Sequence, residues 1–179
     1  RVQLSLNLTP LSTADMTLVC GDAPVQVGQL VELYRGEDSA GIYRITSVRT
    51  ALTRGATVDV HMEHAVVTIG DTVLPGYTEL GGVGMPTGQV IAALLAKQRV
   101  PRWVLGDCDY TDTLAYSWEN ENLLTAILST ATHLTDAMWD FDMSSTPWRL
   151  HLRRMTDNNH CECRMSRNIN RVSINIDQT

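Results

Sequence analysis

The residues best suited to chemistry lie in the stretch HMEH, residues 61–64, where two histidines flank a glutamate. Histidine nitrogens and carboxylates are common zinc ligands, and zinc peptidases place two histidines at positions i and i+4 of a helix. His61 and His64 are one residue short of that spacing. On a strand, His61 and Glu63 share one face while His64 lies on the other, so the three cannot converge on one ion. We therefore predict no metal site, and His61, Glu63 and His64 are the candidates if one exists.

A second acidic cluster lies in DCDYTD, residues 107–112, where Asp107, Asp109 and Asp112 resemble a calcium-binding loop. A loop of the EF-hand kind requires glycine at its sixth position and glutamate at its twelfth, and these positions hold Asp112 and Trp118. We interpret this segment as a solvated acidic loop that precedes a helix.

The four cysteines, Cys20, Cys108, Cys161 and Cys163, are too few and too scattered for a small secreted domain held together by disulfides. We predict free thiols. Cys161 and Cys163 would share a strand face, but a structural zinc needs two further ligands, and no second cysteine or histidine pair has the spacing of a zinc finger.

Other patterns of catalysis are missing from the sequence. The chain has no G-x-S-x-G nucleophile motif, and its glycines at 81, 82 and 84 have neither the spacing nor the lysine of a phosphate-binding loop. The tryptophans can either stack on sugars or fill a core, and their alternating positions favour the core. We expect no catalytic residue, no cofactor and no enzymatic activity.

Composition and charge exclude two further classes of function. The chain of 179 residues is 44% hydrophobic and 19% charged, as in ordinary globular proteins. Its net charge of −6 argues against nucleic-acid binding, which needs clustered lysine and arginine. No apolar run reaches the roughly 20 residues of a membrane helix. Because the chain begins at Arg1 without a methionine, we expect it to be a fragment.

The hydrophobic pattern predicts an α+β fold in two parts. Residues 1–74 show period-two alternation in VQLSLNL, in the hairpin VGQLVELYRGED–SAGIYRITSV and in ATVDVHME, which predicts an antiparallel β-barrel or sandwich that ends in a short helix beginning near Glu63. Residues 75–86 are dense in glycine and proline and predict a linker.

Residues 87–179 predict an α+β region that is truncated at its C-terminus. Its expected elements are helices over 87–98 and 118–134, capped by Thr87 and Ser117, with the strand RWVLGDCDY between them and a loop after that strand. The segments MWDFDM and WRLHLRRM follow as a hairpin, with apolar residues on one face and opposite charges on the reverse. CECRM and RVSINID predict closing strands.

The order of these segments resembles the N-terminal part of the tail-hub proteins of long-tailed bacteriophages, the family often labelled prophage endopeptidase tail or tail-associated lysin. The resemblance spans nearly the whole chain. It is carried by VGQLVELY with GEDSAGIYRITSV, VDVHMEHAVVTIGDTVL, VIAALLAKQ, RWVLGD, YSWENENLLTAIL, WDFD and WRLHL, and SRNINRVSINID resembles the junction into the next barrel of the family.

This resemblance implies a structural function. Three copies would form a ring around the tail axis at the tail tip, joining the distal tail protein to the tip fibre or lysin module and surrounding the end of the tape-measure protein. Synthesis would take place in the bacterial cytoplasm, and any hydrolase module would follow C-terminal to this sequence. Two alternatives stay open: a metal-dependent peptidase or peptidoglycan hydrolase that uses His61, Glu63 and His64, and a carbohydrate-binding module that uses Trp103 or Trp148.

Overall fold

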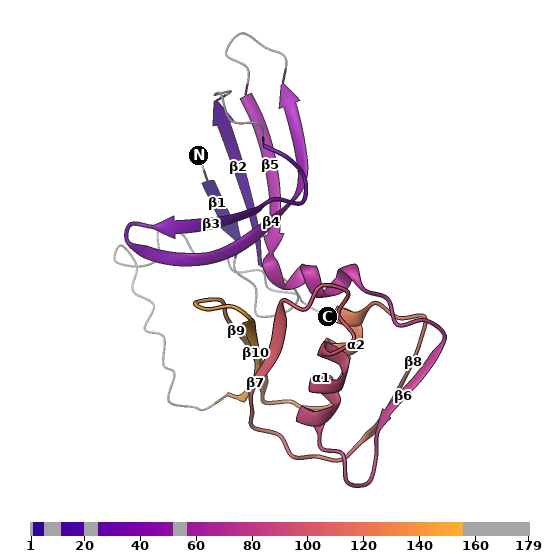
Figure 1. The fold of residues 1–179 in the computed structure, drawn as a ribbon. Coiled ribbons are helices and arrows are strands. Elements are labelled where there is room, and N and C mark those ends of the chain that lie inside the picture. The colour runs from indigo at the N-terminus through magenta and orange to yellow at the C-terminus, as the bar shows by residue number, and fades with distance from the viewer. Residues whose placement is uncertain (1, 6–11, 20–24, 52–56, 156–179) are drawn as a thin grey trace, which may run out of the picture.

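The computed structural model describes residues 2–5, 12–19, 25–51 and 57–155, and their strands form three sheets (Figure 1). The first sheet is antiparallel, has the order β1-β2-β5-β4-β3, and curls around its own cluster of apolar side chains. Its strands are β1 (Val2–Ser5), β2 (Thr13–Val19), β3 (Leu30–Arg35), β4 (Asp38–Ala51) and β5 (Thr57–His64). This barrel-like sheet agrees with the predicted architecture, although its edge strands β1 and β3 do not pair with each other in the described part of the chain.

A single 3₁₀ helix, η1 (Ala65–Asp71), connects this sheet to the rest of the chain. It begins directly after β5, two residues later than the predicted helix start near Glu63, because the ladder between β4 and β5 continues to His64. Ala65, Val66 and Ile69 of η1 are fully buried in a second apolar cluster. The helix therefore joins the curled sheet to a separate hydrophobic core.

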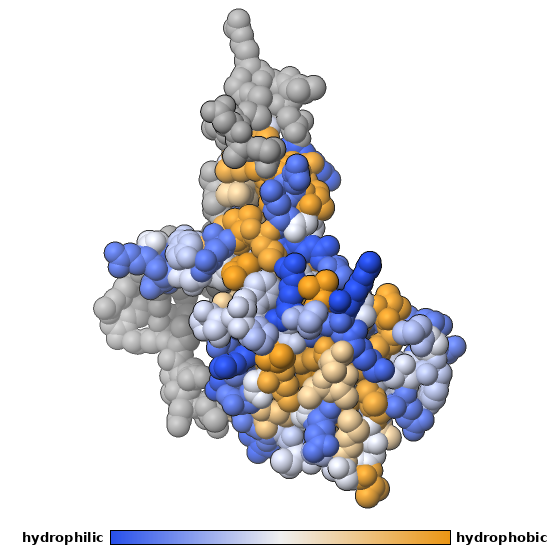
Figure 2. Space-filling model, viewed as in Figure 1, coloured by the Kyte–Doolittle hydropathy of each residue, from blue (hydrophilic) through white to orange (hydrophobic). Residues whose placement is uncertain are grey.

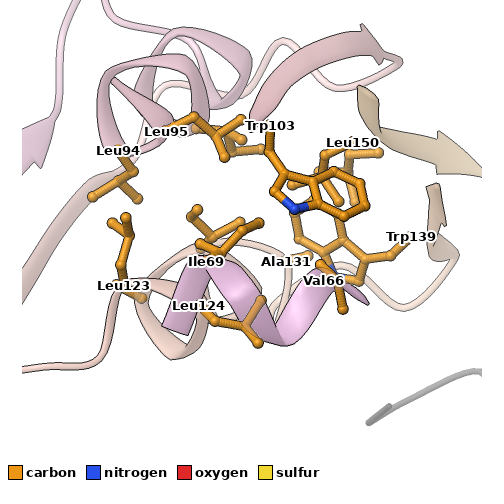
Figure 3. Close-up of a cluster of buried hydrophobic side chains, with 14 of the residues drawn as sticks. Val66, Ile69, Leu94, Leu95, Trp103, Leu123, Leu124, Ala131, Trp139 and Leu150 are labelled. Atoms are coloured by element: carbon orange, nitrogen blue, oxygen red, sulfur yellow. The ribbon is translucent and has the colours of Figure 1, made fainter. Parts of the chain in front are cut away.

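This second core is enclosed by a three-stranded sheet and two short helices (Figure 3). The sheet has the order β7-β10-β9, in which β10 runs parallel to β7 and antiparallel to β9. Side chains of the sheet, of η1 and of both helices belong to one apolar cluster, which includes the indole of Trp103. The elements are α1 (Thr87–Leu95), β7 (Trp103–Cys108), α2 (Leu123–Ser129), β9 (Ala137–Asp142) and β10 (Trp148–Arg154).

The predicted hairpin near the C-terminal end of the described chain is confirmed. Phe141 lies opposite Leu150 and Trp139 opposite Leu152, which places the apolar residues of both strands on the core face. On the reverse face Arg153 Nε lies 3.3 Å from a carboxylate oxygen of Asp140, as the charge pattern indicated. The α+β fold class is confirmed as well.

Residues 75–86, predicted as a linker, contain a strand. β6 (Tyr77–Gly81) pairs antiparallel with β8 (Ala115–Glu119), where the sequence predicted a loop and the start of a helix. Gly81 has a φ of +96°, and a Cβ at this position would overlap the carbonyl oxygen of Leu114, so only glycine allows this close approach. The division of the chain into two units at residues 75–86 stays a prediction.

Both helices are shorter than their apolar patterns predict. Thr87 is the first residue of α1 rather than its cap, because its backbone N–H and its hydroxyl both donate to the carbonyl oxygen of Asp112. The second helix begins at Leu123 and not at Trp118, because residues 115–119 are held in the ladder with β6. Its cap is Asn122, and the predicted cap Ser117 lies within β8. The closing strands predicted in CECRM and RVSINID lie outside the described residues.

The side chain of Asn122 forms hydrogen bonds with two elements, α2 and η1. Its Oδ1 accepts hydrogen bonds from the N–H groups of Leu124 (2.9 Å) and Thr125 (3.3 Å), which caps α2. Its Nδ2 donates to the carbonyl oxygen of Gly70, 2.7 Å away at the end of η1. One side chain thus fixes the start of α2 against η1.

Replacing Asn122 should separate these two contributions to stability. Asn122→Ala removes the cap and the bond to Gly70, and should lower the free energy of unfolding by about 2 kcal/mol. Asn122→Asp keeps the capping oxygen but loses the donor to Gly70, and should cost about 1 kcal/mol. Urea denaturation checks both values. Thr125→Ala, on the exposed face of α2, is the control and should change stability by less than about 0.5 kcal/mol; an Asn122→Ala variant as stable as this control would contradict the assignment.

Candidate functional site

The three predicted metal candidates lie on both faces of the curled sheet. His61 is on the polar face, where its Nδ1 lies 2.7 Å from Asp15 Oδ1 on the neighbouring strand β2. Glu63 lies opposite Arg44 of β4. His64 lies at the end of β5, turned toward the aromatic rings of Tyr43 and Phe141. The structure therefore does not bring the three side chains together, and no group of three or more His, Cys, Asp or Glu residues in the described ranges could hold a metal ion. That none of the three binds a metal stays a prediction.

His64 has a structural role at the junction with η1. Its Nδ1 accepts a hydrogen bond from the N–H of Val66 at 3.3 Å, so the side chain caps this helix. Its ring packs edge-on against Tyr43 and, tilted, against Phe141. Burial among these rings lowers the pKa of His64 to about 4, because the charged imidazolium would lose its hydration. His64 is therefore neutral near pH 7.

A polar groove of about 550 Å³ surrounds His61 on the face of the curled sheet. Ser47 lies opposite His61 on β4, so a serine, a histidine and an aspartate (Asp15) lie in one row across three strands. Only the histidine–aspartate contact is made, and no hydrogen bond joins Ser47 to His61 in the described structure. Nucleophilic catalysis needs the hydroxyl bound to its base. The row is thus a set of cross-strand polar contacts without an activated nucleophile.

The acidic cluster of residues 107–112 is divided among structural contacts. Asp107 Oδ2 lies 3.2 Å from Arg153 Nη2, and Asp109 Oδ2 accepts a hydrogen bond from the backbone N–H of Arg154 at 2.8 Å. Burial raises the pKa of the Cys108 thiol, which disfavours the reactive thiolate. Cys20, Cys161 and Cys163 lie outside the described residues.

The four tryptophans belong to the core, as predicted from their positions. Their exposed fractions are 1% for Trp103, 8% for Trp118, 9% for Trp139 and 7% for Trp148. The indole N–H of Trp103 donates to Thr68 and that of Trp118 to Ser129, so the polar atoms of both rings are used inside the protein. A sugar-stacking platform needs an exposed ring face, which Trp103 and Trp148 do not offer.

His151 is a buried polar residue that the charge pattern of the hairpin did not reveal. Only 6% of it is exposed, and its Nδ1 accepts a hydrogen bond from the N–H of Asp107 at 2.9 Å. Gly106 makes room for the ring, since a Cβ at that position would overlap the imidazole. The sequence signal was a glycine inside a strand, which often marks close packing.

A second cavity, of about 450 Å³, lies where η1 meets the loop between α1 and β7. Arg44 Nη1 lies 2.7 Å from each carboxylate oxygen of Asp71 at its edge. Arg99 and Arg102 are exposed, and neither forms an ion pair with a carboxylate in the described structure. We call this cavity the basic cleft; its lining residues are Gly28, Arg44, Thr68, Asp71, Thr72, Arg99, Val100 and Arg102. Sequence reasoning missed it because Arg44 is far from Arg99 and Arg102 along the chain.

No protein-family model and no curated protein matches the chain. Solved structures do match. They include a tail protein from Neisseria meningitidis, with a TM-score of 0.60 and 14% identity over 84% of this chain and 44% of the other. The 43 kDa tail protein of prophage MuSo2 from Shewanella oneidensis matches with a TM-score of 0.57 and 11% identity over 86% of this chain and 49% of the other. This is the fold of phage tail proteins.

The tail-protein fold also includes an Escherichia coli component of the type VI secretion system, itself described as similar to the T4 tail proteins gp27 and gp5. It matches with a TM-score of 0.59 and 10% identity over 85% of this chain and 48% of the other. The resemblance to phage tail proteins that we predicted from the sequence is therefore confirmed. The chain spans less than half the length of these solved structures. None of the helices in the described ranges is long and apolar enough to cross a membrane.

The buried His64 should make stability depend on pH. The unfolded chain binds a proton on this histidine near pH 6.5, whereas the folded chain binds it only near pH 4. Stability from neutral His64 is thus fully present above pH 6.5 and is lost as the pH falls through about 4, by up to about 3 kcal/mol.

Urea unfolding at about pH 7 and about pH 4.5 checks this dependence. His64→Asn keeps an acceptor for the N–H of Val66 but does not titrate, so the loss of stability on acidification should be smaller than in the wild type. The exposed His133→Asn is the control and should follow the wild type. Equal acid sensitivity in all three proteins would refute the role of His64.

Proposed function

We propose that the chain is a non-catalytic structural component of a phage or prophage tail tip or baseplate hub. Three copies would assemble as a ring that links the tail tube to the tip. The observation that carries this proposal is the similarity over more than four-fifths of the chain to independently solved tail proteins. Their low identities, 14% and below, indicate that this fold tolerates wide changes in sequence, as expected where shape and contact surfaces matter more than a fixed catalytic set.

The arrangement of polar groups supports a scaffold. Ion pairs such as Arg44 with Asp71 and Arg153 with Asp107 and Asp140 lie at the surface and hold neighbouring elements in register. Among the described strands, β1 and β3 form the two edges of the curled sheet, and an edge strand can pair with a neighbouring chain. These features suit a protein that contacts other subunits over several surfaces.

The expected partners follow from the same proposal. They are further copies of the chain, the distal tail protein, the tape-measure protein, and a tip fibre or lysin module. The protein would be made in the bacterial cytoplasm and incorporated into the virion tail tip. Hydrolase activity, where present, would reside in a module C-terminal to this sequence.

The two alternative functions find less support. A metal-dependent hydrolase would need His61 and His64 to reach one ion, but one is paired with Asp15 on the polar face while the other is packed against Tyr43. A carbohydrate-binding module that used Trp103 or Trp148 would need these buried rings to become exposed.

Disrupting the gene in the phage or prophage should abolish complete tails. After induction, electron microscopy should show no complete tails, because the proposed ring links the tail tube to the tip, and mass spectrometry of wild-type tails should detect the protein. The natural full-length protein should be a trimer by mass photometry.

A variant with His61→Ala and Glu63→Ala is the matched control, because it removes two of the three metal candidates and leaves the core intact. It should restore tails in the disrupted strain. Normal tails without the protein would contradict the structural proposal, whereas intact tails that fail to infect only in the His61/Glu63 variant would favour the hydrolase.

A further inference from the structure

The basic cleft is a concentration of positive charge on an acidic protein. The chain has a net charge of −6, yet three arginines and a single aspartate line this cavity. Figure 2 shows hydrophilic residues on the surface where the curled sheet meets the part of the chain that contains the second core. Asp71 already neutralises Arg44, so the unbalanced charges are those of Arg99 and Arg102. The cleft is therefore suited to an anionic group that the described chain does not itself supply.

The backbone that carries these two arginines is held in place. The side-chain amide of Gln98 donates to the carbonyl oxygens of Leu95 and Trp103 and accepts from the N–H of Trp103, which closes the loop between α1 and β7. The N–H of Arg99 donates to Thr72 Oγ1 at 2.9 Å. The carbonyl oxygen of Arg102 accepts from the N–H of Trp148 at 2.8 Å. Because this backbone is already fixed, binding at the cleft costs less conformational entropy.

The chemistry of the cleft favours carboxylates on a protein surface. Guanidinium groups bind carboxylates through paired, charge-assisted hydrogen bonds. Between them Val100 exposes 57% of its surface, which gives an apolar contact beside the charges. Such a mixture of arginine and an exposed apolar side chain is typical of the rim and core of a protein interface.

The same chain presents a complementary acidic element. The turn between β3 and β4 carries Glu37 and Asp38, both exposed, and Glu32 lies next to it on β3. Hydrogen bonds from Tyr34 and, at 2.8 Å, from Ser39 lower the pKa of the Glu32 carboxyl group, so it is ionised near pH 7. Arg35 is the one basic residue of this turn, which leaves an acidic excess.

The acidic turn is too far from its own cleft to fill it. Gly28, just before β3, lines the cleft, whereas Gly36 lies in the turn after β3. At about 3.3 Å per strand residue, the six residues of β3 between them span about 20 Å. The turn projects away from the rest of the described chain at the end of the β3–β4 hairpin (Figure 1). It can therefore reach a cleft only on another molecule.

We propose that the basic cleft receives the β3–β4 turn of a second copy of this chain, with Arg99 and Arg102 facing Glu37 and Asp38. The inference rests on the proposed ring of identical subunits and adds a specific contact to it. Because the cleft and the turn are different surfaces, the contact is heterologous, and repetition around an axis closes a ring without pairing a surface with itself.

Charge reversal in the natural full-length protein tests the contact. Arg99→Glu with Arg102→Glu should weaken trimer assembly at least about tenfold in mass photometry or sedimentation, because like charges then face each other. Glu37→Arg with Asp38→Arg should do the same. Combining all four changes should restore assembly, since the charges are exchanged and again complementary. Lys97→Glu, two residues before Arg99 and outside the cleft, is the matched control and should assemble as the wild type does.

The possible outcomes separate this inference from the proposed function. Trimers that persist unchanged in both reversed proteins, with native circular dichroism, would overturn the contact and leave the ring intact. A wild-type protein that is monomeric at every concentration and missing from tails would overturn both. If each reversal weakens assembly but their combination does not restore it, the cleft and the turn bind other surfaces and the pairing is wrong. Restored assembly only in the combined variant supports it.

Discussion

The structure depends on the passage from β5 into η1, where the chain leaves one hydrophobic core and enters another without an intervening loop. Val66 and Ile69 are fully buried in the second core directly after the last residue of the curled sheet, so the two bodies cannot separate without exposing apolar surface. Neutral His64 caps the helix at this point, the indole of Trp103 donates to Thr68, and Arg44 reaches across from β4 to Asp71. These contacts fix the angle between sheet and core, and the basic cleft exists only because that angle is fixed.

This arrangement uses many polar side chains of the described residues in structural contacts. On the faces of sheets they are used in pairs across neighbouring strands, as with Asp15 and His61 or Asp140 and Arg153. The buried side chains of His151 and Trp103 have partners inside the protein: the imidazole of His151 accepts from the N–H of Asp107, and the indole N–H of Trp103 donates to Thr68. A catalytic site needs acid, base and nucleophile directed into one water-poor volume. Of the candidates from the sequence, His61 is paired with Asp15 and His64 caps η1.

Prediction from the sequence succeeded for elements that bury one face, because burial sets their hydrophobic period. It failed for elements whose conformation depends on packing partners that are distant along the chain. The hairpin of β9 and β10, its apolar face and the pairing of Arg153 with Asp140 were predictable, although His151, expected on the charged face, is buried. The second helix was predicted to begin at Trp118 with Ser117 as its cap, although Trp118 is buried from a strand paired with β6. β6 was not predicted because its segment is rich in glycine, which we interpreted as a sign of a linker. One of these glycines, Gly81, is needed for the close contact with Leu114. The cleft was unpredictable for a simpler reason: Arg44, Arg99 and Arg102 meet only in the folded chain.

Charge distribution has a further consequence for assembly. Copies of a chain with a net charge of −6 repel one another at long range, and salt of physiological strength screens this repulsion beyond about 8 Å. At shorter range, the charges on the two surfaces that meet decide whether two copies attract or repel each other. An approach that brings two acidic surfaces together is disfavoured, whereas one that brings an acidic turn to unpaired arginines is favoured, so the same net charge that opposes random association also selects an orientation. A scaffold that must form one arrangement out of many gains more from such discrimination than from additional apolar contact, because exposed apolar surface attracts every neighbour alike.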